Sequence, residues 1–281
     1  MSSAATTDPQ PLRILLLHGY TQSGPLFSAK TRALYKAFQK SFSPRSIQFS
    51  YPTGPHRLRA TDIPGFSPDQ ADSAENDSKG EVEAYGWWQR KDSTGAGIVY
   101  NGIEEGLAAI AKCIREEGPF DGVIGFSQGA TAAGMVAGLL EGEYRLRGFE
   151  ETEKAGGMKY PESFWGEDGL VQPPLKFAIV YSGFRAPGER YDGFYKPRIK
   201  TKLLHFIGQL DTVVEEERSR GLVACCEEEK VVVHPGGHFL PSQRPWLDAC
   251  VVFVREALEG DKKRDTREEE EESVEDMDVP F

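Results

Sequence analysis

Short apolar runs alternate with helix-like stretches along most of this 281-residue chain, and this alternation constrains the fold more than any other feature. Runs of four to six residues are too short for stable helices and are typical of strands buried on both faces. Strands that alternate with helices form βαβ units, whose strands pair in parallel. The runs lie at residues 13–18, 123–126, 177–181, 203–207 and 231–234.

Two stretches show the spacing of amphipathic helices. In the first, apolar residues recur at helical intervals from Ile103 to Ile114, with Asn101 placed to cap the start and Gly118 to end it. In the second, they recur over residues 247–258. Together with the apolar runs, these helices predict an α/β fold whose mostly parallel sheet is covered by helices on both faces.

We expect a single domain over residues 11–259, between a disordered N-terminus at 1–10 and an acidic, disordered tail at 260–281. Ten acidic and four basic residues in 261–281 supply −6 of the net charge of −11, and so polar a segment cannot bury enough apolar surface to fold. We expect no nucleic-acid partner and no membrane insertion, because no apolar run is long enough to span a bilayer. The N-terminus lacks a signal pattern, which predicts a cytoplasmic location, with the nucleus as the alternative.

Three long stretches break the alternation, at about 52–99, 143–174 and 184–200. All are rich in glycine, proline and charged residues. Long loops inside a compact domain usually serve binding or cover a site, so we expect them to frame the active site.

The four cysteines are Cys113, Cys225, Cys226 and Cys250. Their spacing does not match a metal site, and all four fall in segments that look helical. We therefore expect small buried side chains, with neither a zinc site nor a disulfide framework.

The segment Gly125-Phe126-Ser127-Gln128-Gly129 fits the pattern G-x-S-x-G. This pattern places a serine on a sharp turn between a strand and a helix, with its hydroxyl exposed. The pattern alone is common, but here an apolar strand precedes it and a helix of small residues follows it. The glycines fit a turn so crowded that a Cβ would block it. We predict that Ser127 is a nucleophile.

A serine hydroxyl needs a neighbouring imidazole to take its proton, and in α/β-hydrolases the chain order is serine, acid, histidine. Asp211 follows the strand at 203–207, and His238 follows the strand at 231–234 after two glycines. We predict Asp211 as the acid and His238 as the base. Asp192 is the rival acid, but it sits in an irregular stretch. His234 still belongs to the strand and is expected to be structural. Neither His205, inside a strand, nor His56, in a proline-rich loop, is placed for catalysis.

Acyl transfer also needs two donors for the oxyanion that forms on the substrate. The amide of Gln128, which follows the nucleophile, is the expected first donor. For the second we favour the amide of Tyr20 over that of Thr21, in the loop after the first strand. His18 in that loop is expected to shape it rather than to take part in the chemistry.

Six blocks stand in order along the chain, at residues 17–20, 85–88, 125–129, 182–184, 208–214 and 236–239. Together they resemble the eukaryotic family of small serine hydrolases that is common in fungi, from Arg13 to about Leu258. The resemblance implies a compact α/β-hydrolase with a Ser, Asp, His triad, no metal or organic cofactor, and activity on carboxylic esters or thioesters. Its partner would be a small-molecule substrate or an acyl group on a carrier protein, since some fungal members resemble thioesterases that release polyketides.

The adjacent residues Trp87 and Trp88 cannot both point the same way. One interpretation places one of them in the core and the other, with Phe184, at the wall of a pocket for hydrophobic acyl groups. The alternative places both in the core. Two other functions stay open: a binding protein that has lost the chemistry, and a peptidase.

Overall fold

The chain is described by a computed structural model that covers residues 10–59, 62–63, 83–93, 97–167 and 169–275. Its centre is a sheet of six strands, all parallel, in the order β12-β11-β10-β7-β1-β2. The predicted parallel α/β architecture is confirmed, and β2 is a strand that the apolar pattern had not indicated. The strands are β1 (Leu12–Leu17), β2 (Ile47–Ser50), β7 (Gly122–Phe126), β10 (Phe177–Tyr181), β11 (Leu203–Gly208) and β12 (Glu229–His234).

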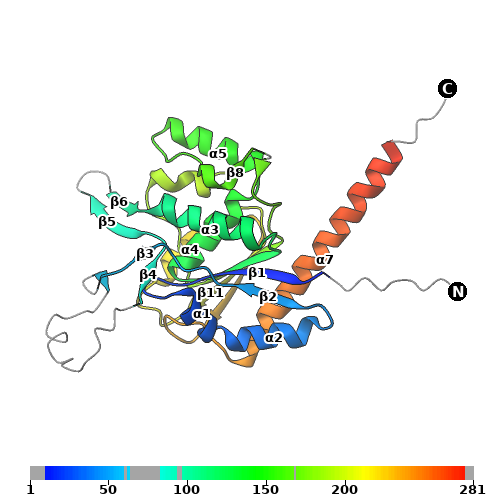
Figure 1. Ribbon diagram of the computed structural model, residues 1–281, viewed down its shortest axis with the longest axis horizontal. Coiled ribbons are helices and arrows are strands. Elements are labelled where there is room, and N and C mark those ends of the chain that lie inside the picture. The colour runs from blue at the N-terminus through cyan, green and yellow to red at the C-terminus, as the bar shows by residue number, and fades with distance from the viewer. Residues whose placement is uncertain (1–9, 60–61, 64–82, 94–96, 168, 276–281) are drawn as a thin grey trace.

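Helices cover both faces of this sheet (Figure 1). Successive side chains of a strand point to opposite faces, so Ile14 and Leu16 belong to one buried cluster while Leu15 and Leu17 belong to the other. The first cluster is closed by α1 (Gly24–Lys30), α2 (Arg32–Phe42) and α7 (Arg244–Glu275). The second is closed by α3 (Ile103–Glu117), α4 (Gln128–Leu139) and α6 (Glu216–Val223).

Helix α3 begins one residue later than the sequence suggested. Asn101 belongs to β6 (Gly97–Asn101), which pairs with β5 (Gln89–Ser93), and the cap is Gly102 in a left-handed conformation with φ of 82°. A Cβ there would lie 2.3 Å from the ring of His56, so the position requires glycine. The helix ends at Gly118, as predicted.

Helix α7 extends through most of the acidic segment and ends at Glu275 (Figure 1). The prediction of a disordered tail from residue 260 is therefore wrong for residues 260–275, while residues 1–9 and 276–281 lie outside the described part. Glutamate, lysine and arginine are good helix formers, and a helix that has already begun needs no new nucleus to continue. Within the described part of the chain, no helix is both long and apolar enough to cross a membrane.

The three long stretches contain short elements of their own. The first holds β3 (His56–Arg57), β4 (Tyr85–Gly86) and β5, and it packs beside the end of β1. The third holds the short helix η4 (Glu189–Phe194) and starts beside the first turn of α4, where Phe184 bonds to Thr131. The second stretch holds α5 (Glu143–Lys154), η3 (Glu162–Phe164), β8 (Trp165–Gly166) and β9 (Gly169–Leu170).

The expectation that all three stretches frame the active site is wrong for residues 143–174. Arg145 of α5 is fully buried and donates to the carbonyls of Gly138 and Gly193, at the far end of α4 from Ser127. Helix α4 has 12 residues, so its two ends lie about 18 Å apart. Helix α5 therefore closes the end of the core that is remote from the serine.

Three of the cysteines, Cys113, Cys226 and Cys250, are buried as expected, and Cys225 is half-buried. The expectation that all four lie in helices is wrong for Cys225 and Cys226, which follow the end of α6 at Val223. Cys226 instead forms a short bridge with Ile199.

The backbone of α4 touches the ends of β1 and β7. A Cβ on Gly129 would lie 2.2 Å from the carbonyl oxygen of Leu17, and a Cβ on Gly125 would lie 2.2 Å from the carbonyl oxygen of Gly129. Real side chains do not tolerate such distances from backbone atoms, which cannot rotate away. Both glycines of the G-x-S-x-G segment are thus required by the approach of the helix to the sheet.

We expect Gly129→Ala to destabilise the protein by about 2 to 4 kcal/mol, because the added methyl group forces α4 away from β1. The measurement is the free energy of unfolding in urea. Gly134→Ala in the same helix is the control: its Cβ would meet only the side chain of Leu222, at 3.4 Å. Alanine favours helix over glycine, so that variant should be within about 1 kcal/mol of the parent. Equal stability of the two variants would contradict the role given to Gly129.

Candidate active site

Ser127 sits on the turn between β7 and α4 with φ of 53°, which is a left-handed conformation that costs a non-glycine residue on the order of 1–3 kcal/mol. Its amide donates to the carbonyl of Tyr181 at 2.8 Å, which ties the turn to the end of the neighbouring strand β10. Its carbonyl accepts from the amides of Ala130 and Thr131 in the first turn of α4. These bonds hold the strained backbone in place, and the side chain is half-buried.

The structure brings Ser127, His238 and Asp211 together. The Ser127 Oγ lies 3.0 Å from His238 Nε2, and His238 Nδ1 lies 2.8 Å from Asp211 Oδ2. An ionised carboxylate can only accept, so Nδ1 carries the proton and Nε2 of the neutral ring accepts from the serine hydroxyl. The ring of Phe126 packs against the imidazole with 4.8 Å between centroids.

Four donors surround the carboxylate of Asp211. Oδ1 accepts from the amides of Val213 and Val214 at 2.9 and 2.8 Å, and Oδ2 accepts from the hydroxyl of Ser182 and from His238, both at 2.8 Å. Burial by itself would raise the pKa of Asp211. The bonds from Val214, His238 and Ser182 outweigh burial, so that the pKa lies below its usual value and the group is ionised.

The loops that carry Asp211 and His238 contact each other through their backbones. Gln209 donates to the carbonyl of His234, and Leu210 donates to that of Gly236. A Cβ on Gly208 would lie 2.7 Å from the carbonyl oxygen of Gly237, so glycine permits this approach. The distance between the acid and the histidine is therefore set by main-chain contacts.

Two backbone amides near the serine lack an acceptor. Among the described residues, neither the Tyr20 amide nor the Gln128 amide donates a hydrogen bond, whereas Thr21 donates to the carbonyl of Tyr85 at 2.9 Å. Of the two loop amides considered from the sequence, only that of Tyr20 is thus available. Gly19 makes the loop possible, because a Cβ there would lie 2.9 Å from the ring of Phe126.

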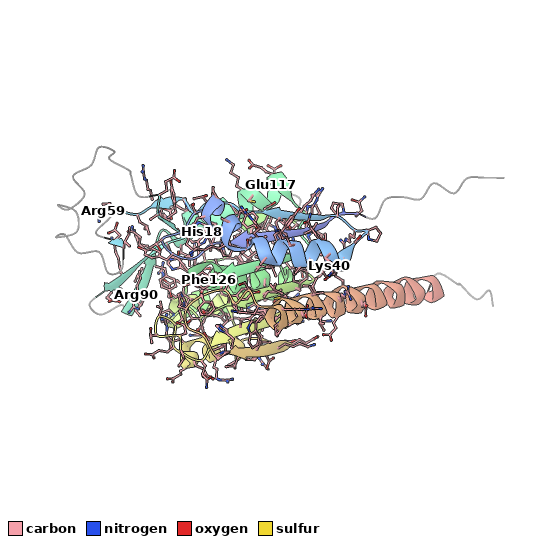
Figure 2. The ribbon with its side chains drawn as sticks, turned by 90° about the horizontal axis from the view of Figure 1, so that it is seen from below. His18, Lys40, Arg59, Arg90, Glu117 and Phe126 are labelled. Atoms are coloured by element: carbon pink, nitrogen blue, oxygen red, sulfur yellow. The ribbon has the colours of Figure 1, made fainter. Side chains whose placement is uncertain are left out.

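His18 holds this loop to the segments around it. Its Nδ1 donates to the carbonyl of Gly19 at 2.8 Å, and its Nε2 accepts from the amide of Gly54 at 2.9 Å. Burial lowers the pKa of His18 to about 4, against a smaller opposing effect of the bond to Gly19. Figure 2 shows His18, which directly follows β1, near Phe126, which is the last residue of β7. A neutral His18 therefore shapes the loop, and both of its ring nitrogens are bonded to the backbone.

Trp87 and Trp88 are both buried, with 0% and 2% of their surface exposed. Trp87 donates from Nε1 to the carbonyl of His18, while Trp88 stacks on Tyr100 at 5.1 Å between centroids. The interpretation that one of them lines an acyl pocket is therefore wrong, and both belong to the core. Their segment turns between β4 and β5, so its two neighbouring side chains both point inward.

The side chain of Gln128 fixes that tryptophan segment. Its Oε1 accepts from the amide of Trp87 at 2.8 Å, and its Nε2 donates to the carbonyl of Trp88 at 2.9 Å. Phe184, the third predicted pocket residue, is half-buried and lies against the first turn of α4, where Thr131 bonds to its carbonyl and amide. Phe184 alone of the three aromatic residues stays a candidate for contact with a substrate.

The rival residues lie in other environments. Asp192 is paired with Arg185 and with Lys196, far along the chain from the histidine loop. His205 is buried beside Cys226, and His234 packs at the edge of Phe239. His56 Nε2 lies 2.8 Å from the carbonyl oxygen of Gly102. Among the described residues, no group of three or more His, Cys, Asp or Glu could hold a metal ion.

Sequence reasoning missed three features of this site. Ser182 bonds to the acid, Phe126 packs on the histidine, and the side chain of Gln128 clamps the tryptophans. The segment at 182–184 stood out in the sequence, but nothing there indicated that a serine at the end of one strand reaches the loop of the next. Strand order supplies that information.

A parallel sheet with a serine on the sharp turn after a central strand, and with an acid and a histidine after later strands, defines an α/β-hydrolase. The family model described as "Serine hydrolase (FSH1)" matches residues 6–250. The chain belongs to this family.

Two curated relatives are similar to this chain over most of its length. Esterase OVCA2 of Danio rerio is 31% identical over 242 residues, covering 83% of this chain and 91% of that protein. A dihydrofolate reductase of Schizosaccharomyces pombe is 32% identical over 254 residues, which is 87% of this chain but 47% of that protein. This chain spans about half the length of the first curated relatives it matches.

Solved structures share the fold. The crystal structure of esterase PE8 aligns with a TM-score of 0.53 at 21% identity, covering 89% of this chain and 94% of that one. At this identity the likeness concerns the arrangement of strands and helices alone.

The buried histidines predict a loss of stability in mild acid. Burial lowers the pKa of His205 to about 4, as it does for His18, from an ordinary value of 6.5. Between these values the unfolded chain binds more protons than the folded one, so stability falls as the pH is lowered. Each histidine should contribute a loss of about 2 kcal/mol between pH 7 and pH 5.

Urea unfolding at pH 7 and at pH 5 measures this loss. His205→Leu should reduce the difference between the two pH values by about 2 kcal/mol, because one histidine whose pKa is lowered by burial has been removed. An unchanged difference would show that the acid sensitivity arises from other groups.

Proposed function

We propose that this chain hydrolyses carboxylic esters or thioesters through an acyl-enzyme formed on Ser127. The observation that carries the proposal is the continuous chain of hydrogen bonds from Ser127 through His238 to Asp211, beside two amides without acceptors. Membership of a serine hydrolase family and the esterase among its relatives support the same reaction class.

In the first step, His238 Nε2 takes the proton of the Ser127 hydroxyl as Oγ attacks the carbonyl carbon of the substrate. The amides of Tyr20 and Gln128 donate to the oxyanion that forms. They are available because neither donates within the described protein. The imidazolium then returns the proton to the leaving oxygen or sulfur, and the acyl group stays on Ser127.

In the second step, water attacks the acyl-enzyme and gives its proton to the same nitrogen of His238. The tetrahedral intermediate collapses, the acid is released, and Ser127 recovers its proton. Asp211 keeps the imidazole in the tautomer that can accept, and its negative charge stabilises the imidazolium in both steps. No group other than water and these side chains is needed for the reaction to balance.

The first test is Ser127→Ala. We expect hydrolysis of a p-nitrophenyl ester to fall by about 10⁴-fold or more and covalent labelling by a fluorophosphonate probe to disappear, because the nucleophile has been removed. Circular dichroism should match the parent. Mass spectrometry of the labelled parent should place the probe on Ser127, and a label on another serine would refute the assignment. Absence of any label on the parent would favour a binding protein without chemistry.

We further propose that the acyl group is hydrophobic. Phe184 lies one helical turn from the serine, and large apolar side chains next to the acid and the histidine are exposed: Leu210 at 69%, Val213 at 60% and Phe239 at 45%. Exposed apolar residues gathered beside one site favour contact with apolar ligands.

Among esters of graded chain length, medium-chain acyl groups should exceed acetyl in kcat/KM by at least about tenfold, since each buried methylene contributes about 0.8 kcal/mol. Phe184→Ala should shrink this gain and change acetyl turnover far less. Trp165→Ala removes an exposed aromatic residue of β8 that packs against Tyr160, and it should leave the preference unchanged. Acetyl esters as the best substrates would refute the hydrophobic site. Thioesters and amides in the same panel separate a thioesterase and a peptidase from an esterase.

A further inference from the structure

The end of β10 links the part of the candidate site that carries Ser127 to the part that carries Asp211. The carbonyl of Tyr181 accepts from the amide of Ser127, and three residues later Phe184 exchanges two hydrogen bonds with Thr131 of α4. Between these contacts, the amide of Ser182 donates to the carbonyl of Phe206 in β11. Residues 181–184 therefore touch the strand and helix of the nucleophile on one side and the strand that leads to the acid on the other.

The backbone of Ser182 is strained. Its φ of 50° lies in the left-handed region, where glycine and asparagine are favoured and serine carries a cost. Gly183 follows directly, and a Cβ there would lie 3.1 Å from the Cβ of Ala130, so the chain passes close to α4. A glycine at position 182 would relieve the strain, and the presence of a serine suggests that its hydroxyl has a use.

The hydroxyl of Ser182 has one partner among the described residues. It donates to Asp211 Oδ2 at 2.8 Å, and that oxygen also accepts from His238 Nδ1. The Ser182 side chain is 2% exposed, so water does not replace this bond in the folded protein. The bond joins the end of β10 to the oxygen on which the orientation of the imidazole depends.

We propose that Ser182 is a positioning residue: its hydroxyl fixes Asp211 Oδ2 against His238 and shares the negative charge of that oxygen. The proposal rests on the proposed acyl transfer by Ser127. With the hydroxyl present, the carboxylate is held by two amides on one oxygen and by Ser182 on the other, so it cannot rotate away from the imidazole. Without it, Oδ2 keeps only His238 as a donor.

Removal of the hydroxyl has two consequences. The carboxylate is less rigidly held, so the imidazole is aligned with Ser127 for a smaller fraction of the time and kcat falls. The charge on Oδ2 is also less dispersed, so it holds a protonated imidazole more strongly. The acid limb of the pH profile therefore moves to higher pH. A residue that served only the fold would lower activity or stability without moving this limb.

The experiment compares Ser182→Ala with Ser182→Gly in the full-length chain. Readouts are the rate of labelling by a fluorophosphonate probe, kcat and KM for a p-nitrophenyl ester, and the pH profile of kcat/KM. We expect both variants to lose about 10- to 100-fold in kcat and in labelling rate, with KM within about threefold and the acid limb shifted upward. The glycine variant tolerates the left-handed backbone, so it keeps the test valid if the alanine variant fails to fold.

Ser219→Ala is the matched control. Ser219 is a serine of α6 whose buried hydroxyl has no hydrogen-bond partner among the described residues, and it does not belong to the candidate site. Its removal should leave all readouts at the level of the parent.

Three results would overturn the proposal. In the first, both Ser182 variants match the Ser219 control. In the second, activity falls but the acid limb does not move, which would indicate a structural role. In the third, Ser182→Gly restores the activity lost in Ser182→Ala, which would show that backbone strain and not the hydroxyl matters. A parent that the probe does not label would refute the acyl transfer itself, and this inference with it.

Discussion

The candidate site depends on one close backbone contact, between the first turn of α4 and the end of β1. Gly129 lies so near the carbonyl of Leu17 that no side chain fits between them. This contact, together with the bond from the Ser127 amide to Tyr181, forces the serine into a left-handed conformation with its hydroxyl half-exposed at the edge of the sheet. Movement of α4 by even one atomic diameter would change the position of the serine and of the amide of Gln128 together.

Hydrogen bonds to the backbone also hold the loop after β1, which carries His18. The neutral imidazole of His18 joins that loop to Gly54, and Gln128 joins the nucleophile turn to the segment of Trp87. The side chains that look most reactive in this region are thus engaged with the backbone. Both tryptophans are buried, and the exposed large apolar residues nearest in the chain to Asp211 and His238 are Leu210, Val213 and Phe239.

The sequence predicted the order of the strands in the chain and the serine turn well, because both depend on local patterns. It placed Asp211 and His238 after the right strands, since in a parallel sheet the loops after the strands meet at one edge. It did not predict contacts that depend on which strands and helices are neighbours in the folded protein. Ser182 reaches Asp211 because β10 pairs with β11, and α5 lies far from the serine because it packs with η4 at the other end of α4.

By itself, the sequence determined the class of fold, the turn that carries Ser127 and the residues able to complete a triad, because apolar periodicity and glycine spacing are properties of short segments. The tertiary structure alone decided that Trp87 and Trp88 are both core residues. It also decided that, among the described residues, the amide of Thr21 has an acceptor and the amide of Tyr20 has none. It also decided that Asp211 accepts four hydrogen bonds. The physical reason is that burial and hydrogen-bond partners come from segments distant in the chain, whose approach no local pattern records.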